Sequence, residues 1–312
     1  MEQPSELAST TILTVQNVKK RYGKFNALDQ INFEIKRGNH LLVLGPNGAG
    51  KTTLIKCIMD LVSFDGTIEV SGTDVKRDPR RAKSLIGYVP QNYAFYESLT
   101  VYEHARLTTR LKRADRAQME EKLGTVDLWN VRMRKVRALS DGMKQRLGIA
   151  LALIGNPPLL LLDEPTSNVD LRGQLEFQAL LQDLLKQGKT LLTTTHLTGL
   201  GELASEVLVI DKGRTVASGS PVELLGKMNV TDTLYVRVNG GDATRVIELM
   251  KAHNATDLNA RGEWITASVP NESKLEVVKS LLDSSYKIED LMIERGKIES
   301  EYLKLLGSKD NN

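Results

Sequence analysis

The chain has 312 residues, enough for two domains, and its 41% hydrophobic content is typical of a globular protein with a buried core. Its 42 basic and 39 acidic residues leave a net charge of +3, too balanced to indicate a nucleic-acid partner, and 5% aromatic residues argue against a base-stacking surface. The lone Cys57 excludes an internal disulfide and a multi-cysteine metal site.

The N-terminal segment and the most apolar stretch both argue against membrane insertion. Residues 1–11 form an N-terminal tail, and its first residues lack the basic and apolar segments of a secretory signal. The apolar stretch at 147–162 is too short to span a bilayer and is interrupted by Gly155, Asn156, Pro157 and Pro158. We therefore expect a chain that is itself soluble.

Residues 12–228 alternate short apolar segments, typical of buried strands, with amphipathic helical segments. This alternation predicts an α/β core with a mostly parallel sheet. The strand candidates are 12–15, 41–44, 67–70, 159–162, 190–194 and 207–210. Between 95 and 135 the pattern becomes helical and strongly charged, which predicts a helical insert within a subdomain at about 95–155.

The strand candidate at 41–44 leads into a phosphate-binding sequence. Its members are Gly45, Pro46, Asn47, Gly48, Ala49, Gly50, Lys51 and Thr52, and Thr53 continues into an apolar helix. They match G-x-x-x-x-G-K-[ST], a loop whose backbone N–H groups surround a nucleotide's phosphates. Lys51 supplies positive charge to the β- and γ-phosphates, Thr52 offers a hydroxyl to Mg²⁺, and the helix N-terminus attracts anions. The segment therefore predicts nucleotide binding.

A second apolar strand candidate, 159–162, ends in two adjacent carboxylates, Asp163 and Glu164. Ligands of α/β proteins bind at the carboxyl ends of parallel strands. Asp163 is therefore expected to reach the Mg²⁺ shell, and Glu164 to orient and deprotonate the attacking water. Together with the phosphate loop, this pair predicts nucleotide hydrolysis as well as binding.

The sequence between these motifs resembles the ATP-binding cassette of ABC transporters, and the resemblance covers roughly 12–225. Leu139, Ser140, Asp141, Gly142 and Met143 resemble the family's signature, usually L-S-G-G-Q. The resemblance implies a P-loop NTPase fold in which this segment opens a helix facing the γ-phosphate held by a partner subunit. The residue types are compatible with this position, because the Ser140 hydroxyl can donate a hydrogen bond to a phosphate and Gly142 allows a phosphate to approach closely.

Four further residues resemble family motifs by their order along the chain. Gln91 resembles the Q-loop glutamine, which contacts Mg²⁺ and the attacking water. Asp170 closes a segment like the D-loop, which communicates between two sites. His196 resembles the switch histidine that hydrogen-bonds the γ-phosphate, and Tyr22 the aromatic residue that stacks on adenine.

The resemblance implies an ATPase that uses ATP and Mg²⁺ and pairs head to tail with a second subunit, here a homodimer. It also implies a separate integral membrane subunit, a position at the inner face of the cell membrane and no nucleic-acid partner. Only about 90 residues separate Thr52 from Ser140, without sustained heptads, which excludes a repair ATPase with a long coiled coil. A different non-transport ATPase stays a remote alternative.

Two departures from the signature affect the expected activity. Asp141 replaces a glycine and places a carboxylate near a triphosphate, where like charges repel, so we expect slow basal turnover. Met143 replaces the usual glutamine, as in ATPases of ABC-2 exporters. The segment at 92–99 also resembles the ATPase that serves copper-site maturation of nitrous oxide reductase, and drug, lipid or polysaccharide export is the alternative.

The last part of the chain predicts a separate small domain at 229–307, followed by a disordered tail at 308–312. Strand and helix patterns alternate in the order β-α-(β)-β-α-β, which predicts a ferredoxin-like α+β unit closed by a helix at 298–306. The acidic stretch at 287–303 with its late tyrosine resembles the tail of ABC-2 exporter ATPases. This resemblance favours export over import.

Overall fold

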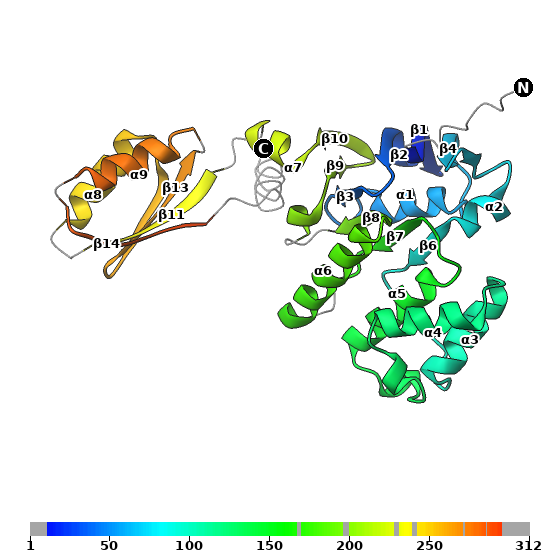
Figure 1. Cartoon of the computed structure of the whole chain (residues 1–312). Coiled ribbons are helices and arrows are strands. Elements are labelled where there is room, and N and C mark those ends of the chain that lie inside the picture. The colour runs from blue at the N-terminus through cyan, green and yellow to red at the C-terminus, as the bar shows by residue number, and fades with distance from the viewer. Residues whose placement is uncertain are drawn as a thin grey trace, which may run out of the picture. The chain divides into compact units, whose positions relative to one another are not determined.

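The computed structural model describes residues 11–166, 170–195, 200–227, 231–238, 242–270, 272–284 and 286–294 (Figure 1). The chain divides into two compact units, Met1–Gly219 and Ser220–Asn312. The helix α7 (Pro221–Lys227) groups with the second unit. Within the described ranges, no helix is both long and apolar enough to cross a membrane.

The first unit is built on a six-stranded sheet with the strand order β10-β9-β3-β8-β7-β6. Its strands are β3 (His40–Leu44), β6 (Ile86–Val89), β7 (Leu159–Asp163), β8 (Thr190–Thr195), β9 (Glu206–Asp211) and β10 (Arg214–Gly219). All pair in parallel except the edge strand β10. Every residue of β3, β7 and β8 is buried, which explains why these strands read as continuous apolar or threonine-rich runs. The predicted α/β core is confirmed.

A second sheet in this unit is antiparallel, with the order β2-β1-β4-β5. It contains β1 (Thr11–Tyr22), β2 (Phe25–Lys36), β4 (Asp65–Val70) and β5 (Thr73–Asp74). The sequence patterns at 12–15 and 67–70 were expected to belong to one largely parallel core. They pair antiparallel with each other in this separate sheet, where β1 also forms a hairpin with β2 through the turn at Gly23, whose φ is +56°.

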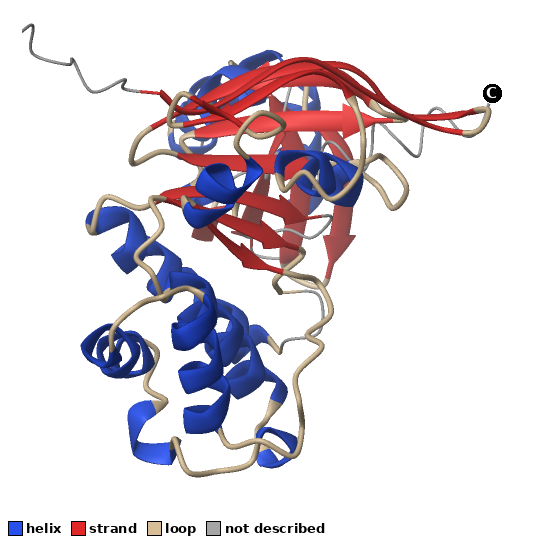
Figure 2. Ribbon diagram, turned by 90° about the vertical axis from the view of Figure 1, so that its right-hand side faces the viewer, coloured by secondary structure: helices blue, strands red, loops and turns tan. Residues whose placement is uncertain are grey.

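The helices of the first unit fall into two groups (Figures 1 and 2). Next to the strands lie α1 (Lys51–Ile58), α2 (Pro79–Ser84) and α6 (Leu171–Lys186). A separate helical group contains α3 (Val101–Leu111), α4 (Arg116–Thr125) and α5 (Asp141–Leu153). Thr100 and Glu103 form a reciprocal capping box at the start of α3, while Asp115 caps α4 and Ser140 caps α5. These polar caps define where each helix begins.

The second unit has the order of elements that the sequence predicts. It consists of β11 (Thr231–Val238), α8 (Ala243–Ala252), β12 (Thr256–Arg261), β13 (Trp264–Pro270), α9 (Lys274–Leu282) and β14 (Ile288–Glu294). The strand order β12-β13-β11-β14, antiparallel throughout, is that of a ferredoxin-like fold. Alternate residues of β11 are buried, and they pack with both helices into a separate core. The helix predicted at 298–306 lies outside the described residues.

His40 at the start of β3 is fully buried in the first unit. Its Nδ1 lies 3.2 Å from the carbonyl oxygen of Leu203, and its Nε2 lies 3.0 Å from the Thr193 hydroxyl. A carbonyl can only accept, so Nδ1 carries the proton and Nε2 accepts from Thr193. Burial lowers the pKa of His40 to about 4, against which the hydrogen bond to the Leu203 carbonyl is a smaller, opposing effect.

This buried histidine predicts acid destabilisation of the chain. Above pH 6.5, His40 is neutral in both states and its contribution to stability is complete. As the pH falls from 6.5 towards 4, the unfolded chain binds the proton first, so the free energy of unfolding falls by about 2.5 kcal/mol by pH 4.5. Urea unfolding measured at pH 7 and at pH 4.5 should show that the free energy of unfolding falls less in His40→Gln than in the wild type. Equal losses in both proteins would contradict this role of His40.

Candidate nucleotide-binding site

The phosphate loop joins β3 to the N-terminus of α1. Gly50, the N-cap of α1, has φ +109°, and a Cβ there would lie 2.6 Å from the carbonyl oxygen of Ala27. A Cβ at Gly45 would collide with the carbonyl oxygen of Ile210. Only glycine fits these two positions. No side chain caps the first turn of α1, so its N–H groups are available to an anion.

A cavity of about 470 Å³ lies against this loop. Its lining is Tyr22, Phe25, Ala27, Pro46, Asn47, Gly48, Ala49, Gly50, Lys51, Thr52, Thr53, Gln91 and Glu164. Most of these residues are predicted from the sequence, and they come together from segments separated by more than a hundred positions. Phe25 and Ala27 on β2 are additions, because β2 itself is not predicted.

Lys51 is 4% exposed and its ammonium group has three oxygen contacts. It donates to the carbonyl oxygens of Gly45 at 2.7 Å and Pro46 at 3.2 Å, and it lies 3.1 Å from Oε1 of Glu164. The cation is therefore held inside the phosphate loop, beside the N-terminus of α1. A phosphate placed in the loop competes with Glu164 for the same ammonium group.

Glu164 links three parts of the site. Its Oε2 accepts a hydrogen bond of 2.8 Å from Nε2 of Gln91, while its Oε1 faces Lys51. Its backbone is left-handed, with φ +46°, and its N–H donates to the hydroxyl of Thr194 at 3.0 Å. Glu164 is 8% exposed, so this carboxylate lies at the border of the cavity and not in bulk solvent. The predicted residues Lys51 and Gln91 thus both contact the predicted Glu164.

Asp163 lies behind Glu164 and is only 1% exposed. Its Oδ1 accepts hydrogen bonds from the hydroxyls of Thr194, at 2.7 Å, and Thr52, at 3.2 Å. Burial raises the pKa of the Asp163 carboxyl, while these two hydroxyl donors and the Lys51 charge lower it. The negative charge of the neighbouring Glu164 also raises this pKa, by less than burial does.

The donor set at Thr52 and Asp163 fits Mg²⁺. Mg²⁺ prefers oxygen ligands and usually takes one or two from the protein, with the others coming from water and phosphates. The Thr52 hydroxyl and the Asp163 carboxylate are adjacent at 3.2 Å and provide such a pair. Among the described residues there is no cluster of three or more His, Cys, Asp or Glu that could hold a metal by itself.

Two aromatic side chains stand at the cavity. Tyr22 ends β1 and is 46% exposed, and Phe25 begins β2 and is 61% exposed. The turn between β1 and β2 places both rings where a nucleotide base can stack. The Lys20 ammonium group lies over one face of the Tyr22 ring, 4.7 Å from its centre.

We predict that Tyr22→Ala weakens the binding of ATP about 10-fold, because stacking on an aromatic ring contributes roughly 1–3 kcal/mol per base. Tyr22→Phe retains the ring and should bind normally. Fluorescence titration with ATP and with inorganic triphosphate separates base from phosphate recognition. An equal loss for both ligands would mean that Tyr22 does not contact the base, and Phe25→Ala would then be the variant to compare.

Ser140 and Gly142 do not line this cavity. The Ser140 hydroxyl accepts a hydrogen bond of 3.3 Å from the N–H of Met143 at the start of α5. Gly142 is half-buried, and a Cβ there would meet nothing within 4 Å. Within one chain, the segment predicted to face a γ-phosphate thus does not line the cavity at the chain's own phosphate loop.

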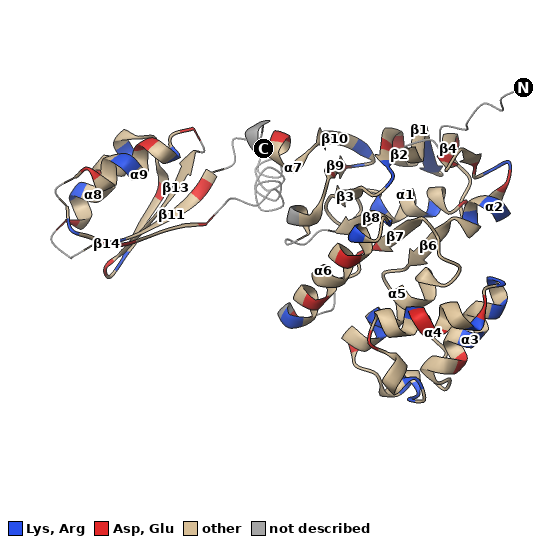
Figure 3. Cartoon of the chain, in the orientation of Figure 1, with Lys and Arg blue, Asp and Glu red and all other residues tan. Residues whose placement is uncertain are grey.

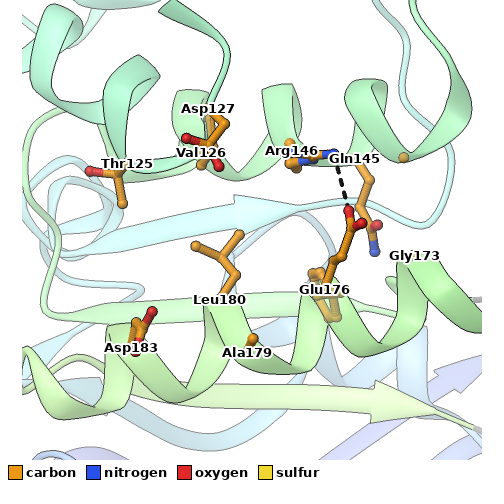
Figure 4. A pocket seen from close by; sticks show the side chains of 12 residues that line it. Thr125, Val126, Asp127, Gln145, Arg146, Gly173, Glu176, Ala179, Leu180 and Asp183 are labelled. Carbon is orange, nitrogen blue, oxygen red and sulfur yellow. Dashed lines mark hydrogen bonds and ion pairs between the residues drawn. The ribbon is translucent and has the colours of Figure 1, made fainter.

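Gly142 instead borders a groove of about 400 Å³ between α5 and α6 (Figure 4). Two contacts join α5 to neighbouring segments there. Arg146 lies 3.2 Å from Glu176 of α6, the pair drawn with a dashed line in Figure 4. The buried Gln145 donates a hydrogen bond of 2.6 Å to the carbonyl oxygen of Pro165, next to Glu164. The position of α5 is therefore linked to the segment that carries Glu164.

The remaining predicted residues have different outcomes. Asp170 is the N-cap of α6, and its Oδ1 accepts a hydrogen bond of 2.8 Å from the N–H of Gly173, so its proposed contact with nucleotide stays a prediction. His196, predicted as the switch histidine, lies outside the described residues, as does the rest of the predicted D-loop segment at 168–169.

The segment 76–81, which contains four basic residues and leads into α2, does not form a surface of one charge sign. Arg77 lies 4.0 Å from Asp74, and Asp78 caps α2 by accepting from the N–H of Arg81. Figure 3 shows Lys and Arg side by side with Asp and Glu over this unit. We interpret the segment as a solvated surface, in line with the balanced net charge.

The sequence is similar to those of known ATP-binding proteins. The family described as ABC transporter matches residues 28–167. The daunorubicin resistance ATP-binding protein DrrA3 of Streptomyces coeruleorubidus is 35% identical over 308 residues, which cover 95% of this chain and 96% of that protein. The Nod factor export ATP-binding protein I of Ralstonia nicotianae is 34% identical over 272 residues, covering 85% of this chain and 84% of its own.

A solved structure matches at the level of the fold. A dimeric bacterial ABC transporter cassette shares 27% identity and has a TM-score of 0.61, over 67% of this chain and 98% of that chain. Because the match to DrrA3 covers 95% of the chain, the likeness to that protein includes the second unit as well as the first.

Proposed function

This chain belongs to the ATP-binding subunits of the ABC transporter family, and from that premise we propose that it binds ATP at the loop 45–52 and hydrolyses it to drive a separate membrane subunit. The observation that carries the proposal is the cavity in which Lys51 and Gln91 both contact Glu164. These residues supply a phosphate-binding cation, a polar positioning group and a general base.

The geometry suggests how the chain's residues act on ATP. The phosphates lie on the N–H groups of the loop and of the first turn of α1, and Lys51 exchanges Glu164 for the β- and γ-phosphates. Glu164 then accepts the proton of the attacking water, which Gln91 helps to orient. The chemistry that Mg²⁺ supplies when bound is neutralisation of phosphate charge, and Thr52 and Asp163 are the residues that would hold it.

A second copy of the chain is proposed to complete each site. Neither Ser140 nor Gly142 lines the cavity at its own phosphate loop; at the N-terminus of α5, Ser140 is exposed and Gly142 is half-buried with open space beside its Cα. In a head-to-tail pair, this helix end of one chain faces the γ-phosphate held by the other. The dimeric cassette among the structural matches supports such a pair. Differential affinity of the open and closed pair for ATP and ADP then drives the cycle.

We further propose export as the direction of transport, with the chain at the cytoplasmic face of the membrane subunit. The names of the two curated relatives, one a resistance protein and one an export protein, support this direction. The membrane subunit, which determines the cargo, is a separate chain.

Inside-out membrane vesicles that contain this chain with its copurified membrane subunit test the proposal. A panel of lipophilic drugs that includes daunorubicin serves as the probe. Export predicts that at least one compound accumulates in the vesicle lumen when ATP is added, and that Glu164→Gln abolishes the accumulation. ATP-dependent loss of a preloaded compound from the same vesicles would reverse the direction, and vesicles without any ATP-dependent flux or ATP hydrolysis would contradict the function.

A further inference from the structure

Thr194 in β8 contacts both carboxylate residues of the site with a single hydroxyl group. It lies directly opposite Asp163 in the parallel pairing of β7 with β8. Its Oγ1 donates to Oδ1 of Asp163 at 2.7 Å and accepts from the N–H of Glu164 at 3.0 Å. The carbonyl oxygen of Thr194 accepts from the same N–H at 3.1 Å. The side chain is fully buried, so these protein groups and not bulk water satisfy it.

The first contact orients the oxygen that Asp163 turns towards the phosphate loop. Oδ1 of Asp163 receives the Thr194 hydroxyl from the sheet side and the Thr52 hydroxyl from α1. Two donors on one carboxylate oxygen fix the rotation of the carboxylate. In metal sites such outer partners set ligand orientation, and their removal typically costs 10- to 100-fold in metal affinity or activity.

The second contact supports the backbone of Glu164. Glu164 adopts φ +46°, a conformation that costs a non-glycine residue about 1 kcal/mol or more. The Thr194 hydroxyl and carbonyl oxygens both receive the Glu164 N–H, which holds the chain in that conformation. This turn directs the Glu164 side chain towards Lys51 and Gln91.

We propose that Thr194 is a positioning residue for ATP hydrolysis, which sets the metal-binding carboxylate of Asp163 and the backbone of Glu164 with one hydroxyl. The proposal rests on the function proposed above. This role requires an atom that both donates and accepts a hydrogen bond, so the hydroxyl of serine can replace that of Thr194. Valine has nearly the same shape as threonine, but its side chain neither donates nor accepts a hydrogen bond.

Thr193 offers a matched control. It is also fully buried in β8 and its hydroxyl also makes a buried hydrogen bond, but with Nε2 of His40. Successive side chains of a strand point to opposite faces, so Thr193 is one residue away yet separate from the carboxylates. Thr193→Val therefore removes a comparable hydrogen bond without touching the site.

The test compares Thr194→Val, Thr194→Ser and Thr193→Val in the full chain. Binding of a fluorescent ADP analogue is titrated in EDTA and in Mg²⁺, kcat and KM are measured for ATP, and thermal unfolding is recorded. For Thr194→Val we expect normal affinity for the ADP analogue in EDTA. The gain in affinity that Mg²⁺ causes should be at least 10-fold smaller than in the wild type, and kcat should fall at least 10-fold with little change in KM. Thr194→Ser should stay within about 3-fold of the wild type.

Thr193→Val should lose thermal stability but keep both the Mg²⁺-dependent gain and kcat. The proposal is overturned if Thr194→Val keeps them as well, or if both valine variants lose them equally. Thr194→Cys, with a weak hydrogen-bonding group, replaces Thr194→Val under the same criteria if the valine variant does not fold. A wild-type chain that binds no nucleotide contradicts the proposed function itself, whereas normal wild-type binding with normal Thr194→Val confines the failure to Thr194.

Discussion

Glu164→Gln is expected to lower kcat for ATP hydrolysis by at least about 100-fold while ATP still binds, because it removes the base that accepts the proton of the attacking water. The amide keeps the size of the side chain, so the turn after β7 and the hydrogen bond from its N–H to Thr194 are retained. The ion pair with Lys51, at 3.1 Å, is lost, which frees the ammonium group for phosphate. Affinity for ATP is therefore maintained or increased.

The same variant should accumulate as an ATP-bound pair. Closure needs bound ATP and reopening needs hydrolysis, so a chain that binds without hydrolysing stays closed. Size-exclusion chromatography with and without ATP measures this, next to single-turnover hydrolysis. Glu120→Gln on α4, which removes an exposed carboxylate paired with Arg116, is the control and should leave both readouts unchanged. Normal turnover in Glu164→Gln would remove Glu164 from the role of general base.

Lys51→Met is expected to weaken ATP binding by about 100-fold, which corresponds to about 2.7 kcal/mol. Methionine preserves much of the buried apolar stem of Lys51, so packing at the start of α1 is largely retained. The variant removes the one described ammonium group that contacts Gly45, Pro46 and Glu164 inside the loop. It also removes the Lys51 charge from beside the Glu164 carboxylate, which is 8% exposed.

Fluorescence titration with an ATP analogue measures the affinity, and thermal unfolding checks the fold. Lys56→Met on the same helix is the control, because Lys56 is exposed on α1 and does not line the cavity. If Lys51→Met binds ATP as tightly as Lys56→Met, the ammonium group contributes nothing to phosphate binding. If Lys51→Met lowers the rate of hydrolysis but not the affinity for ATP, Lys51 stabilises only the transition state.

The sequence predicts those parts of the site that are local in the chain. The phosphate loop is a continuous segment whose glycines are required by positive φ or by close backbone contacts, as at Gly50 and Gly45. Asp163 and Glu164 follow an apolar strand, and the strand end indicates where their side chains lie. These features depend on neighbours within a few residues and can be read from the pattern.

The contacts that depend on strand pairing could not be predicted in this way. Thr194 acts because β8 pairs with β7 in a register that places it opposite Asp163, and a threonine in a strand has no distinctive sequence signal. Phe25 reaches the cavity through the hairpin of β1 with β2, and β2 has no strict alternation of buried and exposed residues. The pairing of β1 with β4 in a second, antiparallel sheet also joins residues far apart in the sequence, so the strand patterns alone do not predict it.

The position of Ser140 and Gly142 is a different case. The sequence resemblance assigns them to a nucleotide site, yet a single chain presents them away from its own loop. The reason is physical: the site is proposed to form between two chains, so neither the sequence nor the structure of one chain contains the complete arrangement.

Mixing two inactive variants tests the shared site most directly. Lys51→Met has a defective phosphate loop, and Gly142→Asp places a carboxylate at the helix end proposed to face the partner's phosphate, in a position where a Cβ meets nothing within 4 Å in its own chain. Each variant alone should hydrolyse ATP at background rates. An equimolar mixture should recover up to about a quarter of wild-type activity, because mixed pairs contain one intact site. A mixture as inactive as its components, or full activity of Gly142→Asp alone, would contradict a site built from two chains.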